Sequence, residues 1–347
     1  MTGNEAIAAG AIRAGCGFYA GYPITPQNEL TAYMAKNMPE NNRIFIQAES
    51  ELAAINMVFG ASAAGVRAMT SSSSPGISLK QEGISYLAGS ELPAVIVNIM
   101  RGGPGLGNIS PSQSDYFQAT KGGGHGDYHS IVLSPSSVEE AYRLMFDAFE
   151  LADKYRNPVI ILGDGMLGQM MEPISLQAKK YKLRAKPWAL TGCSGRKPNI
   201  IRSLLLKDGA LEALNLKLQK SYKQIQKKEQ RWEELYLDDA DIVVVAYGGM
   251  ARVIKSVVRQ LRQKNKKVGF IRPISLWPFP VNAFAKLAKA KVKYLVVEMS
   301  YGQMVEDVKL AVNCAVPVGF FGRAGGGMPT EEEIIGAIKK LGFKKYG

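Results

Sequence analysis

The sequence predicts an α/β protein built from two domains, each with a mainly parallel sheet. Three observations support this. Short apolar segments alternate with amphipathic segments of helical period, which is typical of α/β folds. Residues 93–100 (PAVIVNIM) and 158–164 (PVIILGD) are almost continuously apolar, as parallel strands buried on both faces are. The alternation also starts afresh at residue 241, and 347 residues suffice for about two domains.

The first alternation predicts a domain over residues 1–174. Its expected strands are 17–22, 43–47, 66–70, 93–100, 129–133 and 158–164. Its expected helices are 5–14, 26–37, 49–64, 75–88 and 138–154. We expect Asn4 and Thr25 to cap the first two helices, because short polar side chains can accept hydrogen bonds from the free N–H groups of a first turn.

The second alternation predicts a domain over residues 238–347. Its expected strands are 241–248, 267–273, 294–300 and a strand with its turn at 317–326. Its expected helices are 250–264, 303–313 and one that begins at Thr330. The segment 273–280 (PISLWPFP) is too rich in proline for a helix and is expected to be a loop. Between the domains, residues 175–237 predict a basic connector with a helix over 210–236.

Charge is distributed unevenly along the chain. The net charge is +13, but residues 1–174 carry −6 while 175–237 and 238–347 carry +10 and +9. The basic segments contain neither a recognition motif nor interleaved aromatic residues, so we expect no nucleic-acid partner. The positive surface could instead dock an acidic protein, or it could simply be solvated; the sequence leaves both open.

Membrane insertion and redox-metal binding find no support in the sequence. No apolar run approaches the roughly 18–20 residues of a membrane span, and the N-terminal residues do not resemble a signal peptide. Cys16, Cys193 and Cys314 are isolated, so an iron–sulfur cluster or zinc site built from this chain alone is not expected. We expect a cytoplasmic protein that contributes no metal ligands.

Ligands of open α/β sheets bind beyond the carboxyl ends of the strands. Five loops lie at such ends: 21–27, 47–51, 70–76, 101–127 and 163–169. Glu51 lies where one of these loops enters a helix, and its carboxylate could either cap that helix or contact a ligand nitrogen. Arg101 directly follows an apolar strand and could bind a substrate carboxylate or form a surface ion pair.

Other polar residues of these loops predict less. The glycine-rich segment 102–107 is not followed by a convincing helix, which argues against a dinucleotide site. His125 and His129 lack the spacing of a zinc pair and a third ligand. The hydroxyls of Ser71–Ser74 are expected to tether the backbone rather than to act as nucleophiles.

Residues 163–165 (GDG) resemble the opening of the magnesium and thiamine-diphosphate signature. That signature needs a paired asparagine about two dozen residues later, and no asparagine occurs between Asn157 and Asn199. The part of such a site that binds the diphosphate is therefore missing from this chain.

Taken together, the motifs resemble the alpha-type subunit of the 2-oxoacid:ferredoxin oxidoreductases. The matching segments, in order, are GYPITP (21–26), QAESELAA (47–54), TSSSSPGISLKQEGISYLAG (70–89), NIMRGGPGLGN (98–108), GDYHSIVLSPSS (126–137), VAYGGMARV, IRPISLWPFP and VVEMSYGQM. The resemblance covers nearly the whole chain. It is strongest to the branched-chain (3-methyl-2-oxobutanoate) enzyme, with the 2-oxoglutarate enzyme as a close relative.

This resemblance implies roles for individual residues. The first domain would bind the pyrimidine of thiamine diphosphate, and the second would resemble the C-terminal domain of transketolase. Glu51 matches the glutamate that binds the pyrimidine nitrogen and favours the imino tautomer, which removes the thiazolium proton. Arg101 matches the arginine that binds the substrate carboxylate and would also contact the cofactor, and Thr25 matches a threonine that contacts substrate and cofactor. Tyr22 would line the substrate pocket, and Ser73 would lie beside the cofactor.

The resemblance also implies an activity and partners. The complex would oxidatively decarboxylate a 2-oxoacid to acyl-CoA and CO2 and pass electrons to ferredoxin. A beta-type subunit would hold the diphosphate, Mg²⁺ and a [4Fe-4S] cluster, and ferredoxin-like and gamma-type subunits would complete the assembly. Coenzyme A would be the co-substrate. Two alternatives remain: a 2-oxoglutarate-specific enzyme, and a non-catalytic assembly subunit of such a complex.

Overall fold

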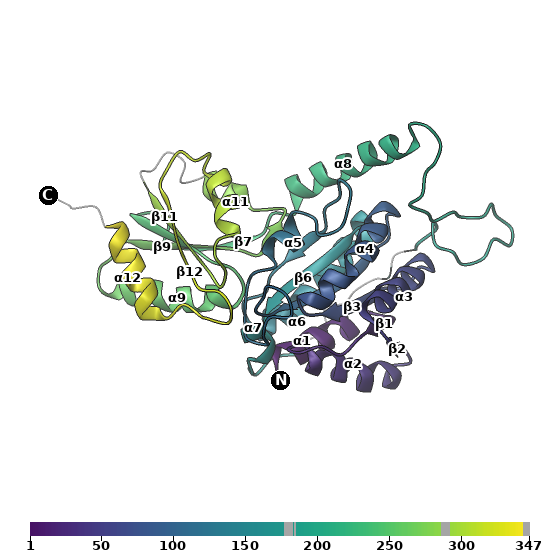
Figure 1. Ribbon diagram of the computed structural model, residues 1–347, viewed down its shortest axis with the longest axis horizontal. Helices are drawn as coiled ribbons and strands as arrows, with labels where there is room; N and C mark the ends of the chain where they lie inside the picture. The colour runs from purple at the N-terminus through teal and green to yellow at the C-terminus, as the bar shows by residue number, and fades with distance from the viewer. Residues whose placement is uncertain (177–182, 184, 286–291, 343–347) are drawn as a thin grey trace.

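The computed structural model describes residues 1–176, 183, 185–285 and 292–342, which fold around two sheets (Figure 1). The first sheet has the strand order β10-β5-β6-β4-β3-β1-β2. Its strands are β1 (Phe18–Gly21), β2 (Ile44–Gln47), β3 (Ala68–Ser72), β4 (Ala94–Met100), β5 (Ile131–Leu133), β6 (Pro158–Asp164) and β10 (Ser275–Trp277). Every pairing is parallel except that of β10 with β5. The first predicted parallel sheet is thus confirmed.

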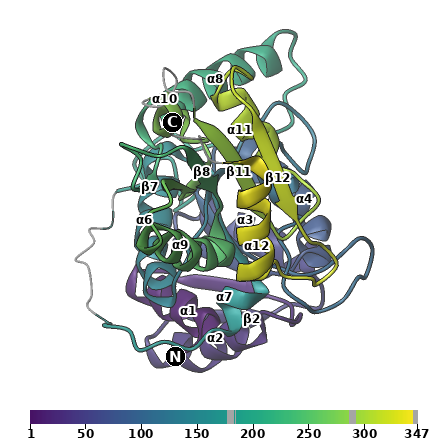
Figure 2. The same ribbon diagram turned by 90° about the vertical axis from the view of Figure 1, so that its left-hand side faces the viewer.

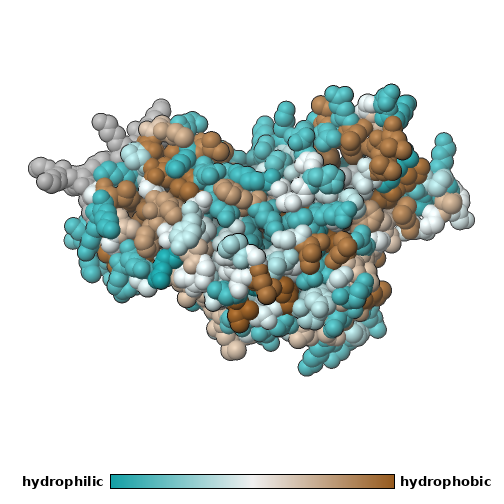
Figure 3. Space-filling view, viewed as in Figure 1, coloured by the Kyte–Doolittle hydropathy of each residue, from teal (hydrophilic) through white to brown (hydrophobic). Residues whose placement is uncertain are grey.

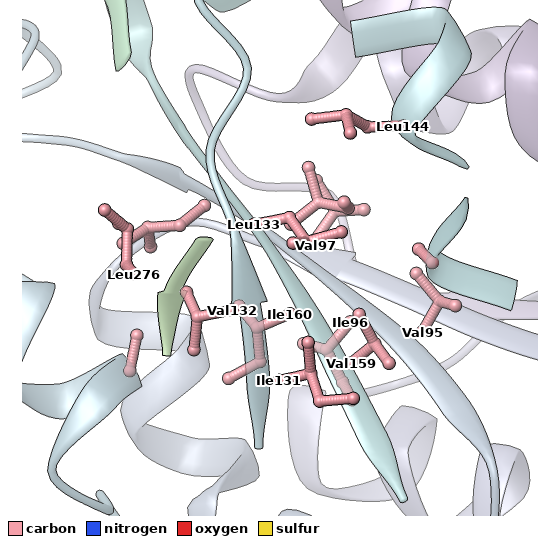
Figure 4. Packing of buried hydrophobic residues seen from close by; sticks show 14 of the residues in the cluster. Val95, Ile96, Val97, Ile131, Val132, Leu133, Leu144, Val159, Ile160 and Leu276 are labelled. Atoms are coloured by element: carbon pink, nitrogen blue, oxygen red, sulfur yellow. The ribbon is translucent and has the colours of Figure 1, made fainter. Parts of the chain in front are cut away.

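The centre of the first sheet is fully buried. Every residue of β4 and β6 is buried, and the two strands pair in register, with Ile96 opposite Ile160. Figure 4 shows the aliphatic side chains of β4, β5 and β6 packed together, with Leu144 of a neighbouring helix above them. Burial on both faces explains why these strands lack the polar alternation of a half-exposed strand.

Two groups of helices cover this sheet, and its strands run between them in Figure 1. One group contains α1, α2 and α6, and the other contains α3 and α4. The helices of this half are α1 (Gly3–Arg13), α2 (Asn28–Glu40), α3 (Glu51–Ala63), α4 (Pro75–Gly89), α5 (Tyr116–Thr120), α6 (Val138–Tyr155), α7 (Gly165–Gln169) and α8 (Ala210–Lys228). Loops, rather than the long covering helices, follow directly at the carboxyl ends of the strands.

The second sheet has the order β12-β11-β8-β9-β7 and is parallel except for β7, which runs antiparallel to β9. Its strands are β7 (Trp232–Leu235), β8 (Ile242–Val245), β9 (Val268–Pro273), β11 (Lys293–Glu298) and β12 (Val318–Gly322). Its helices are α9 (Gly248–Gln263), α10 (Val281–Ala285), α11 (Met304–Ala311) and α12 (Glu331–Leu341). The second parallel-sheet unit is confirmed as well.

Two short edge strands differ from the sequence prediction. Residues 275–277, expected to be a loop, form β10 at the edge of the first sheet. Residues 232–235, expected to continue a helix, form β7 at the edge of the second sheet. Edge strands of three or four residues tolerate neighbouring proline and give little periodic signal, so local sequence does not reveal them. The domain limits at 174 and 237 stay a prediction.

The expected caps of the first two helices are wrong. Thr2 caps α1, because its side chain accepts a hydrogen bond from the backbone N–H of Glu5. Asn4 is buried instead, and its amide donates to the carbonyl oxygen of Pro26 at 2.7 Å. Thr25 precedes α2 by a turn, and Gln27 occupies the N-cap position. The tertiary contact of Asn4 is one that a local pattern cannot show, whereas the side-chain oxygen of Thr25 accepts from the side chain of Asn28 three residues later.

The helix α8 packs beside the first sheet (Figures 1 and 2), and part of the chain before it forms a loop that projects from the body of the molecule (Figure 1). Tyr222 of α8 contacts His129 and Trp277 edge to face, and the last two rings are stacked 4.5 Å apart. His129 therefore belongs, with Tyr222 and Trp277, to a cluster of three aromatic rings, called the aromatic joint below, through which α8 contacts the first sheet. Figure 3 shows apolar residues gathered on the surface around α8 and the chain before it, where Leu204 and Leu206 are exposed.

None of the described helices is both long and apolar enough to cross a membrane.

Buried polar contacts join the two halves of the molecule. Gln113 donates to the carbonyl oxygen of Tyr247 at 2.9 Å and accepts from the N–H of Met299 at 3.0 Å. Asp164, at the end of β6, accepts from the N–H of Leu167 at 2.9 Å and of Gly249 at 2.7 Å. These contacts hold the second sheet against the carboxyl edge of the first.

Candidate active site

The sequence-predicted residues come together at one edge of the first sheet. Tyr22 and Thr25 follow β1, Glu51 follows β2, Ser73 follows β3 and Arg101 follows β4. The strands β4, β3, β1 and β2 are consecutive neighbours in the sheet. Because all four are parallel, their carboxyl ends place these loops side by side.

Arg101 is a buried cation without an acidic partner among the described residues. Its side chain donates from Nη1 to the carbonyl oxygen of Thr25 at 2.9 Å and from Nη2 to that of Leu106 at 3.1 Å. Its Nε has no hydrogen-bond partner, and only 7 % of the residue is exposed. The alternative of a surface ion pair is therefore wrong. A buried guanidinium held only by carbonyl dipoles retains a strong attraction for an anion.

Thr25 belongs to the same structure through its backbone. Its carbonyl oxygen accepts from Arg101, while its side-chain oxygen accepts from Asn28 at 3.1 Å. Gln27 ties the loop to β3, because its Oε1 accepts a hydrogen bond from Ser71 at 2.6 Å. Tyr22, at the rim of the same loop, is exposed. The loop after β1 thus presents one anchored residue and one accessible ring.

Glu51 is the first residue of α3 and is 6 % exposed. The capping role falls to Ser50, whose side chain accepts from the N–H of Ala53 at 3.2 Å. The carboxylate of Glu51 accepts no hydrogen bond from any residue that the structure describes. Its Oε1 lies against Gly76, where an added Cβ would stand 2.6 Å away. Of the two sequence hypotheses, contact with a ligand fits this geometry and side-chain capping does not.

The serine run at the end of β3 divides into two pairs. Ser71 and Ser74 have hydrogen-bond partners: Ser71 donates to the Gln27 side chain, and Ser74 donates to Asp115 at 2.6 Å. Of these two, Ser74 also holds backbone as expected, because it accepts from the N–H of Arg101, whereas the partner of Ser71 is a side chain. The hydroxyls of Ser72 and Ser73 are buried and have no partner among the described residues. Unpaired buried hydroxyls are uncommon and point toward a bound polar group.

A supporting network behind Arg101 escaped the sequence analysis. The backbone N–H of Arg101 donates to Ser74 Oγ at 3.0 Å, and Asn98 donates to Asp115 at 2.9 Å. Burial raises the pKa of Asp115, while these donors from Ser74 and Asn98 oppose the shift. The Ser74 φ of 26° is strained for a residue with a side chain. No local pattern marks these residues, because their partners come from separate loops.

Lys80 was also missed. It lies on α4 and is completely buried, and its Nζ donates to the carbonyl oxygen of Glu51 at 3.4 Å. Burial lowers the pKa of Lys80 to about 8, and the negative charge of Glu51 opposes this shift. A lysine at an inward helical position is the one signal that could have identified it.

The remaining motifs take structural positions. Asp164 of the GDG segment is fully buried and accepts from two backbone N–H groups, so its carboxylate is engaged in joining α7 to α9. His125 is exposed, and His129 belongs to the aromatic joint. Within the described ranges, no three acidic, histidine or cysteine side chains group as metal ligands would.

Two family models match the chain. The model described as pyruvate flavodoxin/ferredoxin oxidoreductase, thiamine diphosphate-binding, matches residues 9–229. The model described as pyruvate:ferredoxin oxidoreductase core domain II matches residues 240–334. The first match contains Glu51, Arg101 and every other candidate residue of the site.

Two curated relatives each match more than nine-tenths of the chain. The ketoisovalerate oxidoreductase subunit VorB of Methanothermobacter marburgensis is 51 % identical, over 98 % of this chain and 97 % of that protein. The 2-oxoglutarate synthase subunit KorA of Archaeoglobus fulgidus is 38 % identical, over 93 % of this chain and 94 % of that protein.

A solved structure agrees with these relatives. The 2-oxoglutarate:ferredoxin oxidoreductase of Magnetococcus marinus, determined with 2-oxoglutarate, coenzyme A and succinyl-CoA, superposes with a TM-score of 0.86 at 29 % identity. It is matched over 98 % of this chain and 64 % of its own. The chain therefore belongs to the pyruvate flavodoxin/ferredoxin oxidoreductase family.

Proposed function

We propose that this chain is the alpha-type subunit of a thiamine-diphosphate-dependent 2-oxoacid:ferredoxin oxidoreductase that prefers branched-chain 2-oxoacids. The complex would convert the 2-oxoacid and coenzyme A to acyl-CoA and CO2 and pass two electrons to ferredoxin. One observation carries the proposal: a buried carboxylate, Glu51, and a buried guanidinium, Arg101, border the same sheet edge, and neither forms an ion pair with a described residue. Two such groups suit a cationic heterocycle and an anionic substrate.

The residues present fit the pyrimidine half of the coenzyme. The hydroxyls of Ser72 and Ser73 are buried and unpaired among the described residues, and Ser72 Oγ lies against Gly76 as Glu51 Oε1 does. Gly76 lets Glu51 approach α4 closely, since a Cβ there would meet the carboxylate. When bound, thiamine diphosphate supplies the nucleophilic carbon and the electron sink for decarboxylation. Glu51 would bind the pyrimidine ring nitrogen and hold the proton there, and Ser73 would contact the ring.

Arg101 would bind the carboxylate of the 2-oxoacid. Both Nη atoms already donate hydrogen bonds to backbone carbonyl oxygens, so the plane of the guanidinium is fixed before substrate binds. A preoriented cation lowers the entropic cost of binding. Thr25 would contact substrate and coenzyme from the loop after β1, and the exposed ring of Tyr22 would cover the substrate. Loss of the carboxylate as CO2 then removes the group that Arg101 holds.

A partner subunit would supply the rest of the coenzyme site. Asp164, the acidic residue of the GDG segment, is engaged by backbone N–H groups, and the paired asparagine of the signature is absent. We infer that a beta-type subunit holds the diphosphate, Mg²⁺ and a [4Fe-4S] cluster, and that ferredoxin-like and gamma-type subunits join it. The relatives are named as subunits, which supports a multi-subunit complex.

Branched-chain preference rests on relative similarity. Identity is 51 % to the ketoisovalerate relative and 38 % to the 2-oxoglutarate relative. The test is purification of the complex with its own partners, followed by viologen reduction with 3-methyl-2-oxobutanoate, 2-oxoglutarate, pyruvate and an arylpyruvate. We expect the highest kcat/KM for 3-methyl-2-oxobutanoate. A higher value for 2-oxoglutarate would assign the enzyme to that subtype, and reduction by none of the four would leave a non-catalytic assembly role.

A further inference from the structure

Helix α4 has an inverted arrangement of charge and apolarity near its beginning. Leu79 is 59 % exposed, whereas Lys80, the next residue, is completely buried. An ordinary surface helix turns leucine inward and lysine outward, because burying an ammonium costs far more than exposing one leucine. The chain therefore bears an energetic cost at this position.

The packing of α4 against α3 directs Lys80 toward Glu51. Gly76, Lys80 and Gly83 recur every three to four residues and so lie on one face of α4. A Cβ at Gly76 would stand 2.6 Å from Glu51 Oε1, and one at Gly83 would stand 2.6 Å from Ile55 Cγ2. The two glycines thus bring the helices close together on either side of Lys80. The lysine side chain is enclosed between them.

The surroundings of Lys80 provide little other compensation. Its Nζ makes one hydrogen bond, 3.4 Å long, to the carbonyl oxygen of Glu51. It forms no ion pair with a carboxylate of the described residues, and Glu51 is the charged group that favours its protonated form. Coulomb interaction over a short distance in a partly desolvated region is strong even without direct contact. The feature that best accounts for a buried lysine here is therefore the carboxylate of Glu51.

We propose that Lys80 is a positioning residue for Glu51. Its ammonium holds the first turn of α3 through the carbonyl oxygen of Glu51, and its positive charge attracts the Glu51 carboxylate and holds it in the orientation that faces the coenzyme pyrimidine. The role depends on the proposed function, because it acts through the contact between Glu51 and the coenzyme. Lys80 itself touches neither substrate nor coenzyme in this role.

The experiment compares charge-free variants of Lys80 in the complex assembled with its partners. Lys80→Met keeps an unbranched apolar stem of nearly the same length and removes the charged end; Lys80→Gln serves as a second variant. The readout is the rate of hydrogen–deuterium exchange at the thiazolium carbon of bound thiamine diphosphate, measured by NMR after acid quench without substrate. We expect exchange to slow at least about tenfold in both variants, with unchanged assembly.

Two further variants separate the possible outcomes. Gln81→Leu removes a buried polar side chain from the same helical turn and should exchange at the wild-type rate. Glu51→Gln should slow exchange more than either Lys80 variant. Wild-type exchange in Lys80→Met and Lys80→Gln beside slow exchange in Glu51→Gln would overturn the inference alone. Wild-type exchange in Glu51→Gln would instead overturn the proposed role of Glu51. Failure of both Lys80 variants to assemble would show a structural lysine and contradict the inference as well.

Discussion

The guanidinium of Arg101 donates a hydrogen bond to the carbonyl oxygen of Thr25 at 2.9 Å, across 76 residues of sequence. The contact joins the loop after β4 to the loop after β1 at the carboxyl edge of the sheet. A single side chain thereby organises two segments of the proposed pocket while its Nε stays free of protein partners among the described residues.

Replacing Arg101 should weaken substrate binding more than turnover. Arg101→Ala removes the cation that would bind the 2-oxoacid carboxylate, so we expect KM to rise about 100-fold, equivalent to about 2.7 kcal/mol. Arg101→Lys keeps the positive charge but loses the planar guanidinium, so its KM should lie between those of the wild type and Arg101→Ala. Initial rates of viologen reduction over a range of 3-methyl-2-oxobutanoate concentrations measure this. An unchanged KM in Arg101→Ala would remove the residue from the pocket.

Replacing Glu51 should abolish turnover with little effect on folding. Glu51→Gln keeps the size of the side chain but removes its negative charge, and we expect kcat to fall by about 100-fold or more. The cap of α3 is Ser50, so the helix should remain intact. Viologen reduction by the complex, with far-ultraviolet circular dichroism of the chain, tests both statements. Substantial turnover in Glu51→Gln would contradict the assignment.

Gly76→Ala should displace the carboxylate of Glu51. The new Cβ would stand 2.6 Å from Glu51 Oε1 and would also collide with Ser72 Oγ. We expect affinity for thiamine diphosphate, measured by calorimetric titration of the complex, to fall about tenfold or more. Gly60→Ala on α3 is the matched control, since nothing lies within 4 Å of its added Cβ. It should bind the coenzyme normally and gain up to about 1 kcal/mol of stability.

Lys80 should make stability depend on pH in the alkaline range. Its pKa is about 8 in the folded chain, against 10.5 for the ordinary side chain. Between these values the unfolded state binds more protons, so the free energy of unfolding should rise with pH from about 8 to 10.5, by up to about 3 kcal/mol. Urea unfolding of the wild-type chain and of Lys80→Met measures the difference. The variant should lack this rise and should be the more stable protein near pH 7; equal pH profiles would show that Lys80 does not titrate there.

The contrast between stability and function makes Lys80 informative. A lysine retained for packing would lower stability when replaced by methionine. One retained for its effect on Glu51 would raise stability on the same replacement and impair the coenzyme. Opposite signs in the two measurements are expected of a residue kept for function at the expense of stability.

Much of this architecture could be predicted from sequence because the central strands are almost entirely apolar, and such a composition indicates strands buried on both faces. The runs that became β4 and β6 are apolar at almost every position, and the loops after parallel strands identify the ligand edge without coordinates. Glu51 and Arg101 were found for that reason, and the structure places both at this edge. Their roles toward coenzyme and substrate stay predictions.

The missed features depend on contacts between distant segments. β10 exists because β5 offers it an edge, and the helical pattern through residue 236 gives no sign that β9 recruits 232–235 as a strand. The cap predicted at Asn4 is wrong because the partner of its side chain, Pro26, belongs to another loop. Ser74 and Lys80 likewise acquire their roles only when β4 and α3 are placed beside them.

The strand β10 has a consequence for how this polypeptide can be divided. Residues 275–277 return from the second half of the chain to complete the outer border of the first sheet beside β5. A fragment that ended at residue 174 would leave the backbone donors and acceptors of β5 uncovered next to aliphatic side chains, an arrangement prone to self-association. Separate expression of the two halves would therefore require that they find each other, since neither sheet-bearing portion holds every strand of the larger sheet.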